Sequence, residues 1–199
     1  PQNTPPTASK AASWNSAPKA QKQDASFFKA DKSRPSSREA AELGEANLSE
    51  EQTIVLEEIM AGKNVFITGC GGTGKSHLMH HAIKAMRKLR GKHAVAVTAT
   101  TGIAACHIGG TSLHGFAGIG LGAGSVPELV KKVRGNRQSC SRWQRTQVLI
   151  VDEISMLDAE LFDKLEAVAR EVRGEANRPF GGMQVILVGD FLQLPPVGK

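Results

Sequence analysis

One eight-residue stretch limits what this chain can fold into. Residues 69–76 read Gly-Cys-Gly-Gly-Thr-Gly-Lys-Ser, a complete G-x-x-x-x-G-K-[ST] phosphate-binding loop. A β-branched and aromatic run over residues 65–68 precedes the loop, and apolar residues near helical spacing follow it over residues 76–89. Strand, loop and helix therefore come in the order that the motif requires, which favours a phosphate site over a chance glycine-rich turn.

This loop offers the groups that a nucleotide phosphate needs. Its glycines let backbone N–H groups approach phosphate oxygens, and the positive end of the following helix faces the same anion. We expect Lys75 to reach the β- and γ-phosphates and the Ser76 hydroxyl to bind Mg²⁺. The expected nucleotide-binding residues of the loop are Gly69, Cys70, Gly71, Gly72, Thr73, Gly74, Lys75 and Ser76.

An acidic pair follows a buried run later in the chain. Residues 147–151 are typical of a core strand, and Asp152 and Glu153 come directly after it. Carboxylates at the end of a buried strand cost free energy unless they bind something. We expect Asp152 to bind Mg²⁺, directly or through water, and Glu153 to orient and deprotonate an attacking water.

A further polar side chain is expected at the same end of the sheet. Residues 183–188 predict another strand, and the loop after it carries Gln193. In open α/β sheets, ligands gather at the carboxyl ends of the strands. Gln193 therefore fits a sensor of the γ-phosphate, although an ordinary hydrogen bond within the loop is the alternative.

Strands and helices alternate along most of the chain. This alternation predicts an α/β fold with a doubly wound parallel sheet and helices on both faces, the architecture of a P-loop NTPase. Residues 1–46 are rich in Pro, Ser, Ala, Lys and Gln and lack periodic hydrophobicity. We therefore expect a disordered leader over residues 1–46 and one folded domain over residues 47–199.

Composition limits the remaining function classes. The net charge of +6 is compatible with a polyanionic partner, and the absence of Tyr argues against an aromatic RNA-binding sheet. No apolar run approaches the ~18 residues that a membrane helix needs, so no membrane partner is expected. Three widely spaced cysteines indicate a reducing compartment, with neither a disulfide framework nor a zinc site.

Gln52 has two interpretations. It lies three residues after Ser49, so it can form the far half of a capping box at the start of a helix. Its amide could instead pair with the edge of an adenine, because it offers a donor and an acceptor side by side. The sequence pattern alone favours the cap.

Other polar residues also allow two interpretations. Thr98, Thr100, Thr101 and Gly102 lie at the carboxyl end of the expected strand over residues 94–98. Hydroxyls there can bind phosphate or cap the next helix, and the cap is favoured. Basic residues recur between Lys131 and Arg145. A solvated face is the favoured interpretation, and a phosphate-contacting patch is the alternative. Trp143 fits a packing anchor better than a base-stacking ring.

Together the motifs resemble those of superfamily 1 helicases. The matching segments are residues 69–76, 97–105, 111–120, 151–156 and 189–197. The acidic motif Asp-Glu-Ile-Ser-Met, the Phe-Gly-Gly turn and the Gly-Asp-Phe-Leu-Gln-Leu-Pro-Pro run are similar to the petite-integration-frequency (Pif) DNA helicases, relatives of the RecD type. Residues 161–184 resemble that family's signature insert, and the resemblance covers residues 48–199.

The resemblance implies a RecA-like first motor lobe of a 5′→3′ ATP-dependent DNA helicase, with ATP and Mg²⁺ as cofactors. The implied partners are single-stranded, forked and G-quadruplex DNA and RNA–DNA hybrids, in DNA repair, recombination and telomere maintenance. Gln52 matches the adenine-reading glutamine, and this match reverses the preference for a cap. The phosphate, metal, base and sensor positions match Lys75, Ser76, Asp152, Glu153 and Gln193. The implied DNA contacts are Thr98, Thr101, Gly102, His114 and Phe116.

The resemblance also implies a missing part. The family's second RecA-like lobe should follow Lys199 and carry an arginine that reaches the γ-phosphate. We therefore expect a monomeric lobe that binds nucleotide weakly and does not unwind DNA by itself, from a protein of the nucleus or the mitochondrion. A nucleotide-dependent switch and a fragment that only binds nucleotide or DNA are the alternatives, and Phe116 could also be a core residue.

Overall fold

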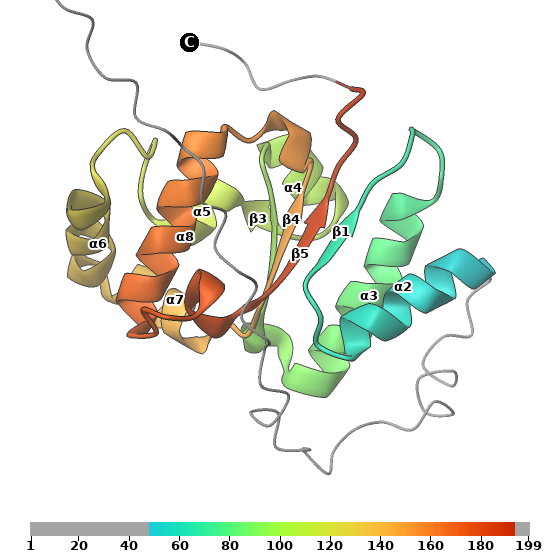
Figure 1. Cartoon of the computed structure of the whole chain (residues 1–199), viewed down its shortest axis with the longest axis horizontal. Helices are drawn as coiled ribbons and strands as arrows, with labels where there is room; N and C mark the ends of the chain where they lie inside the picture. The colour runs from blue at the N-terminus through green and yellow to red at the C-terminus, as the bar shows by residue number, and fades with distance from the viewer. Residues whose placement is uncertain (1–47, 194–199) are drawn as a thin grey trace, which may run out of the picture. The chain divides into compact units, whose positions relative to one another are not determined.

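A sheet of five parallel strands forms the centre of the fold (Figure 1). The computed structural model describes residues 48–193, so the predicted leader lies outside the described residues. The strands are β1 (Val65–Ile67), β2 (Val95–Ala99), β3 (Thr111–Ser112), β4 (Val148–Asp152) and β5 (Gln184–Val188). Their order in the sheet is β1-β5-β4-β2-β3, which confirms the predicted doubly wound α/β class.

Helices connect these strands on both faces of the sheet (Figure 1). The α-helices are α2 (Glu50–Met60), α3 (Lys75–Arg90), α4 (Gly102–His107), α5 (Leu113–Ala117), α6 (Val126–Gly135), α7 (Arg137–Arg145) and α8 (Ala159–Arg173). Short 3₁₀ turns are η2 (Lys92–Ala94), η3 (Ile154–Met156) and η4 (Pro179–Gly182). Within residues 48–193, no helix is both long and apolar enough to cross a membrane.

The strand residues divide the core into two layers. Successive side chains of a strand point to opposite faces of the sheet, so a continuous apolar strand supplies both layers. Val148 and Ile150 of β4 pack in the layer of α2, α3 and α4. Leu149 and Val151 pack in the layer of α5 to α8, where Trp143 is fully buried and donates its indole N–H to the Ala117 carbonyl over 2.9 Å. The predicted packing role of Trp143 is confirmed.

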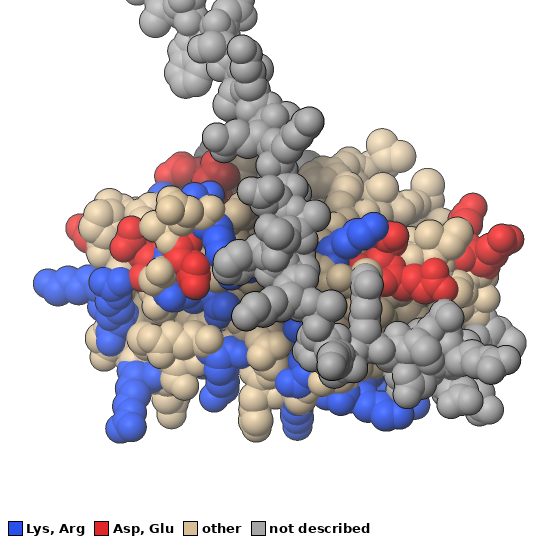
Figure 2. Space-filling model, turned by 60° about the horizontal axis from the view of Figure 1, so that its bottom comes forward, with Lys and Arg blue, Asp and Glu red and all other residues tan. Residues whose placement is uncertain are grey.

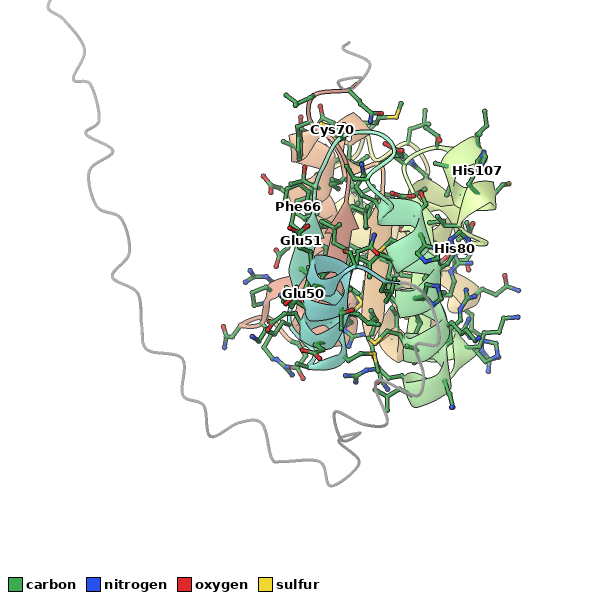
Figure 3. The ribbon with its side chains drawn as sticks, turned by 90° about the vertical axis from the view of Figure 1, so that its right-hand side faces the viewer. Glu50, Glu51, Phe66, Cys70, His80 and His107 are labelled. Carbon is green, nitrogen blue, oxygen red and sulfur yellow. The ribbon has the colours of Figure 1, made fainter. Side chains whose placement is uncertain are left out.

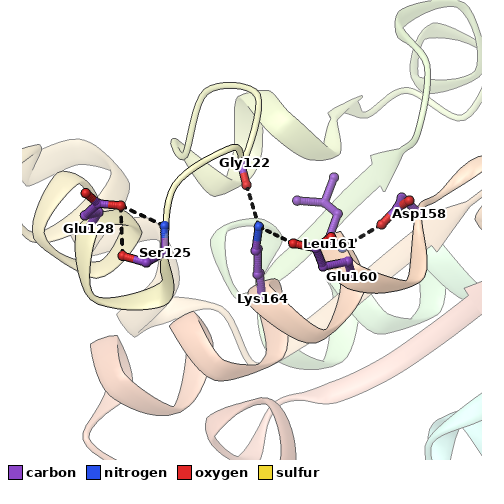
Figure 4. Close-up of polar contacts among 7 residues, drawn as sticks. All are labelled: Gly122, Ser125, Glu128, Asp158, Glu160, Leu161 and Lys164. Atoms are coloured by element: carbon purple, nitrogen blue, oxygen red, sulfur yellow. Dashed lines mark hydrogen bonds and ion pairs between the residues drawn. The ribbon is translucent and has the colours of Figure 1, made fainter. Parts of the chain in front are cut away.

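Side-chain caps fix where the helices begin. Asp158 Oδ1 accepts the Leu161 N–H over 3.1 Å at the start of α8. The Glu128 carboxylate accepts from the Ser125 N–H and hydroxyl, both over 2.8 Å, at the start of α6 (Figure 4). Between these two helices, Lys164 donates to the Gly122 carbonyl over 3.3 Å and fastens the glycine-rich loop to α8.

Arg173 joins three segments at the end of α8. Its guanidinium donates to the Gly181 carbonyl of η4 over 2.7 Å and to the Thr146 carbonyl over 2.7 Å. It also donates to the carbonyl of Trp143, in the last turn of α7. These carbonyls have no helical partner of their own, so Arg173 supplies the donors that the end of α7 lacks.

Arg173→Met should lower the free energy of unfolding by about 2 kcal/mol or more, because several carbonyls lose a charged donor at once. The measurement is chemical denaturation of both proteins under the same conditions. The matched control is Arg137→Met, which removes an exposed arginine without a hydrogen-bond partner among residues 48–193. Equal stability of the two variants would contradict a joining role for Arg173.

Candidate nucleotide-binding site

Three motif segments meet because of the strand order. β5 lies between β1 and β4, and all three strands run parallel, so their carboxyl ends are neighbours. The phosphate-binding loop follows β1, the acidic pair follows the apolar part of β4, and Gln193 follows β5. The sheet thus gathers at one edge the residues that the sequence distributes over more than a hundred positions.

Carbonyl groups of the phosphate-binding loop accept hydrogen bonds from the lysine of the same loop. Lys75 Nζ donates to the Gly69 carbonyl and, over 2.8 Å, to the Cys70 carbonyl. Gly72 and Gly74 have φ angles of 82° and 84°, which a side chain rarely tolerates, so glycine is required at these turns. Because α3 begins at Lys75, its unpaired N–H groups open toward the loop. Cys70 is exposed near the tip of the loop (Figure 3).

Gln52 combines a capping role with a contact to the loop. Its Oε1 accepts the Ser49 N–H over 3.1 Å, and its own N–H donates to Ser49 Oγ over 3.2 Å, which confirms the capping box. The Nε2 of the same amide lies 3.5 Å from the carbonyls of both Thr73 and Gly74. The cap therefore holds the amide beside the phosphate-binding loop, and the predicted adenine contact stays a prediction.

The acidic pair stands in a strained and partly dehydrated setting. Burial raises the pKa of the Asp152 carboxyl, against the lowering effects of the Glu153 N–H, which donates over 2.9 Å, and of the Lys75 charge. Glu153 has a φ of 54°, a left-handed conformation that is unfavourable for a side chain of this size. Strain at the residue that should position water is typical of a site preorganised for chemistry.

Thr100 holds the backbone of this pair. Its hydroxyl donates to the Glu153 carbonyl over 3.0 Å, and its N–H donates to the Asp152 carbonyl over 3.2 Å. The sequence suggested phosphate binding or helix capping for this threonine, and neither describes these bonds. The hydrogen-bond partner lies more than fifty residues away, and no local sequence signal indicates it. The sequence therefore did not predict this positioning role.

Gln193 lies beside the phosphate-binding loop. Its Nε2 donates to Asp190 Oδ2 over 2.8 Å, and a Cβ placed on Gly71 would lie 3.7 Å from the same nitrogen. Asp190 Oδ1 accepts the Leu192 N–H over 3.0 Å. The Leu192 and Gln193 bonds, in that order, lower the pKa of Asp190, and the Lys75 charge adds to the effect. Sequence reasoning assigned no role to Asp190, although the Gly-Asp-x-x-Gln motif placed it three residues from the sensor.

Oxygen donors at this edge fit a magnesium ion that is shared with a nucleotide. Between residues 48 and 193, no group of three or more His, Cys, Asp or Glu side chains is arranged so that it could hold a metal ion by itself. Mg²⁺ commonly uses one or two protein oxygens and completes its octahedron with phosphate oxygens and waters. The Asp152 carboxylate and the Ser76 hydroxyl offer such oxygens, and a cation would compensate the partly buried carboxylate.

Two of the implied DNA contacts are corrected. Thr98 is fully buried, and its hydroxyl donates to the Ile150 carbonyl over 2.6 Å. Phe116 is 3% exposed, and its ring packs 5.0 Å from the Trp143 ring, so the core alternative describes it. Neither side chain reaches the surface where a DNA strand could touch it.

The other three implied DNA contacts lie at the surface. Thr101 is half-buried and caps α4, with its hydroxyl accepting the Ala104 N–H over 3.2 Å, as the capping interpretation predicted. Gly102 is exposed and His114 is half-buried. All three lie on or beside α4 and α5, near the carboxyl end of β2.

The sequence profile of PIF1-like helicases matches residues 47–199. The chain belongs to the PIF1-like helicase family. It is 53% identical over 152 residues to the ATP-dependent DNA helicase PIF1 of Saccharomyces cerevisiae, and this match covers 76% of the chain and 18% of that protein. The chain thus spans about a fifth of the length of the curated relatives it matches.

Two solved PIF1-like structures have the same fold. The crystal structure of Pif1 helicase from Candida albicans matches with a TM-score of 0.75 and 51% identity, over 77% of this chain and 35% of that one. The Pif1 helicase from Bacteroides in complex with ADP-AlF3 and ssDNA matches with a TM-score of 0.66 and 35% identity, over 77% of this chain and 34% of that one. The family and the RecA-like fold that the sequence implied are confirmed.

Phe116→Ala should lower the free energy of unfolding by about 3–5 kcal/mol, because it leaves a cavity beside Trp143. Chemical denaturation measures the change. The control is His114→Ala on the same helix, whose side chain is half-buried and should cost about 1 kcal/mol or less. A Phe116→Ala protein as stable as the control would contradict the placement of this ring in the core.

Asp152→Asn should raise the melting temperature of the nucleotide-free protein at neutral pH. Burial raises the folded-state pKa of Asp152, so the ionised carboxylate destabilises the folded protein above that pKa. The penalty disappears as the pH falls below the unfolded pKa of aspartate, about 3.9. The melting temperatures of the variant and the unsubstituted protein, measured from neutral to acidic pH, should therefore converge at acidic pH. A variant less stable than the unsubstituted protein at neutral pH would show that the carboxylate is compensated.

Proposed function

We propose that the intact protein is an ATP-dependent 5′→3′ DNA helicase and that residues 48–193 form its first nucleotide-binding lobe. One observation carries the proposal: the phosphate-binding loop, the acidic pair and Gln193 converge at the carboxyl ends of β1, β4 and β5. Membership of the PIF1-like family supports the same function.

The side chains at this edge divide the work of ATP hydrolysis. Lys75 would exchange the Gly69 and Cys70 carbonyls for the β- and γ-phosphates. Glu153 would accept a proton from the attacking water, with its backbone held by Thr100. Gln193, oriented by Asp190, would donate its amide to the γ-phosphate. Bound Mg²⁺, held by Ser76 and Asp152, would neutralise charge on the phosphates.

Single-stranded DNA is the proposed track. The Bacteroides structure was determined in complex with ssDNA, and its fold matches 77% of this chain. Thr101, Gly102 and His114 are the implied contacts that remain accessible on or beside α4 and α5. Forked and G-quadruplex DNA, action as a monomer, and a nuclear or mitochondrial location belong to the same proposal and follow from the family resemblance.

A second RecA-like lobe of the intact protein should complete the catalytic site. Phosphoryl transfer needs a cation at the γ-phosphate, and an arginine finger is typically worth about 10³–10⁵ in rate. Within residues 48–193, Lys75 supplies positive charge to this edge of the sheet. Stepping along DNA is a second requirement, because it needs two lobes that close around ATP. Both requirements support the proposal that a lobe by itself binds nucleotide without unwinding DNA.

Glu153→Gln in the intact protein should keep ATP affinity within a few fold and reduce DNA-stimulated hydrolysis by about 10²-fold or more, because the amide keeps the shape and loses the base. Nucleotide affinity and single-turnover hydrolysis are measured side by side, with Glu175→Gln as an exposed control. Lys75→Ala should lose hydrolysis by about 10²–10³-fold and bind ATP more weakly.

Two outcomes would contradict the proposal. Hydrolysis that is unchanged in both variants would mean that ATP is not hydrolysed at this edge of the sheet. Hydrolysis that depends on Glu153 but is indifferent to DNA would leave an ATPase switch in place of a helicase motor.

A further inference from the structure

The outer edge of the sheet is only half covered. β3 pairs with the last two residues of β2, through Thr98 opposite Thr111 and Ala99 opposite Ser112. Among residues 48–193, no strand pairs on this side with the first three residues of β2. A hollow of about 230 Å³ lies here, and we call it the basic notch. It is bounded by the ends of α3 and α7, η2 and residues 109–111.

Basic side chains from three elements line the basic notch. Arg87 comes from α3, Lys92 and His93 come from η2, and Arg142 and Arg145 come from α7. No Asp or Glu of residues 48–193 lines it. Figure 2 looks toward the end of the molecule where α3 and α7 finish, and it shows Lys and Arg side chains spread along the lower part of this face.

Three of the arginine and lysine side chains have no partner in the described part of the chain. The Nε of Arg87 is buried without a hydrogen-bond partner, and Lys92 and Arg145 are exposed without a hydrogen bond or ion pair. Arg142 differs, because its Nε and Nη2 donate to the carbonyls of Phe116 and Gly115 over 3.1 and 3.0 Å. A buried donor without a partner costs free energy, and cations without partners in a hollow attract an anion.

The helix dipole explains only part of this arrangement. Cations in the last turn of α3 offset the negative end of that helix, which accounts for their presence on α3. Arg142 and Arg145 likewise lie in the last turn of α7. The dipoles do not account for the buried Nε of Arg87, which has no hydrogen-bond partner among residues 48–193. Guanidinium groups that converge without carboxylates fit a phosphate, whose oxygens accept paired N–H donors.

We propose that the basic notch binds a phosphate of the DNA backbone. The inference rests on the proposed function and extends the DNA path beyond the implied contacts. Thr111 is exposed, lines the notch and belongs to residues 111–120, one of the segments that resemble the helicase motifs. A strand that passes the surface of α4 and α5 can therefore continue over this edge. The notch then holds the strand by charge, without reading its sequence.

The test compares two charge-matched double variants of the intact protein. Arg87→Gln with Arg145→Gln removes two notch cations and keeps most of each stem. Lys88→Gln with Arg137→Gln removes two exposed cations from the same helices that do not line the notch. Binding of a fluorescent oligothymidylate is titrated at several salt concentrations between about 50 and 200 mM. Thermal melts of both variants establish that each is folded, and Arg145→Gln alone preserves the test if the double variant is not.

The notch variant should bind the oligonucleotide about five- to tenfold more weakly than the control variant. The slope of log affinity against log salt should fall by about 0.7 for each phosphate that the variant no longer neutralises, and the control should keep the slope of the unsubstituted protein. Arg145→Gln alone should show a smaller change in the same direction.

Three results would overturn the proposal. Equal weakening in both double variants would mean diffuse attraction, and unchanged binding in the notch variant would leave the notch without DNA. If the notch variant instead loses binding to a labelled polyglutamate peptide while its DNA affinity stays unchanged, the occupant is an acidic peptide. An unsubstituted protein that binds no oligonucleotide would remove the proposed function itself, a result distinct from failure of the notch alone.

Discussion

The position of β5 between β1 and β4 is the constraint on which the rest of the structure depends. Parallel pairing places three carboxyl ends in a row, and each end delivers a different chemical group to the same edge. An additional strand within this row would separate the phosphate-binding loop from the acidic pair. The apolar residues that alternate along these strands build both core layers, so the packing that stabilises the sheet also sets the spacing of the site.

Rigid neighbours hold the site in this arrangement before any ligand arrives. The capping box of α2 holds the Gln52 amide beside the loop, Thr100 binds the backbone of the acidic pair, and Asp190 orients Gln193. The two Thr100 bonds hold the backbone of the pair and so oppose the unfavourable conformation of Glu153. The free energy that keeps these two residues in place comes from hydrogen bonds to segments far away in the sequence.

The sequence predicted those parts whose chemistry requires a fixed spacing. The strand and helix around the phosphate-binding loop, and the strand that ends in the acidic pair, were found where the motifs predicted them. The helix α7 was not predicted, because Cys140 and Trp143 are the only apolar residues in it and two positions are too few to define a period. The roles of Thr98 and Thr100 were missed for another reason. Each hydroxyl finds its acceptor about fifty residues away, and only the paired sheet brings them together.

The half-covered edge of β2 also bears on how copies of the protein behave toward one another. A strand edge with unpaired N–H and C=O groups invites a strand from a second chain, and natural proteins often block such edges with charge. Arg87, Lys92 and Arg145 surround this edge with like charge in every copy. Two such edges therefore repel each other. The cations proposed to bind a phosphate thus also oppose strand pairing between two copies of the protein.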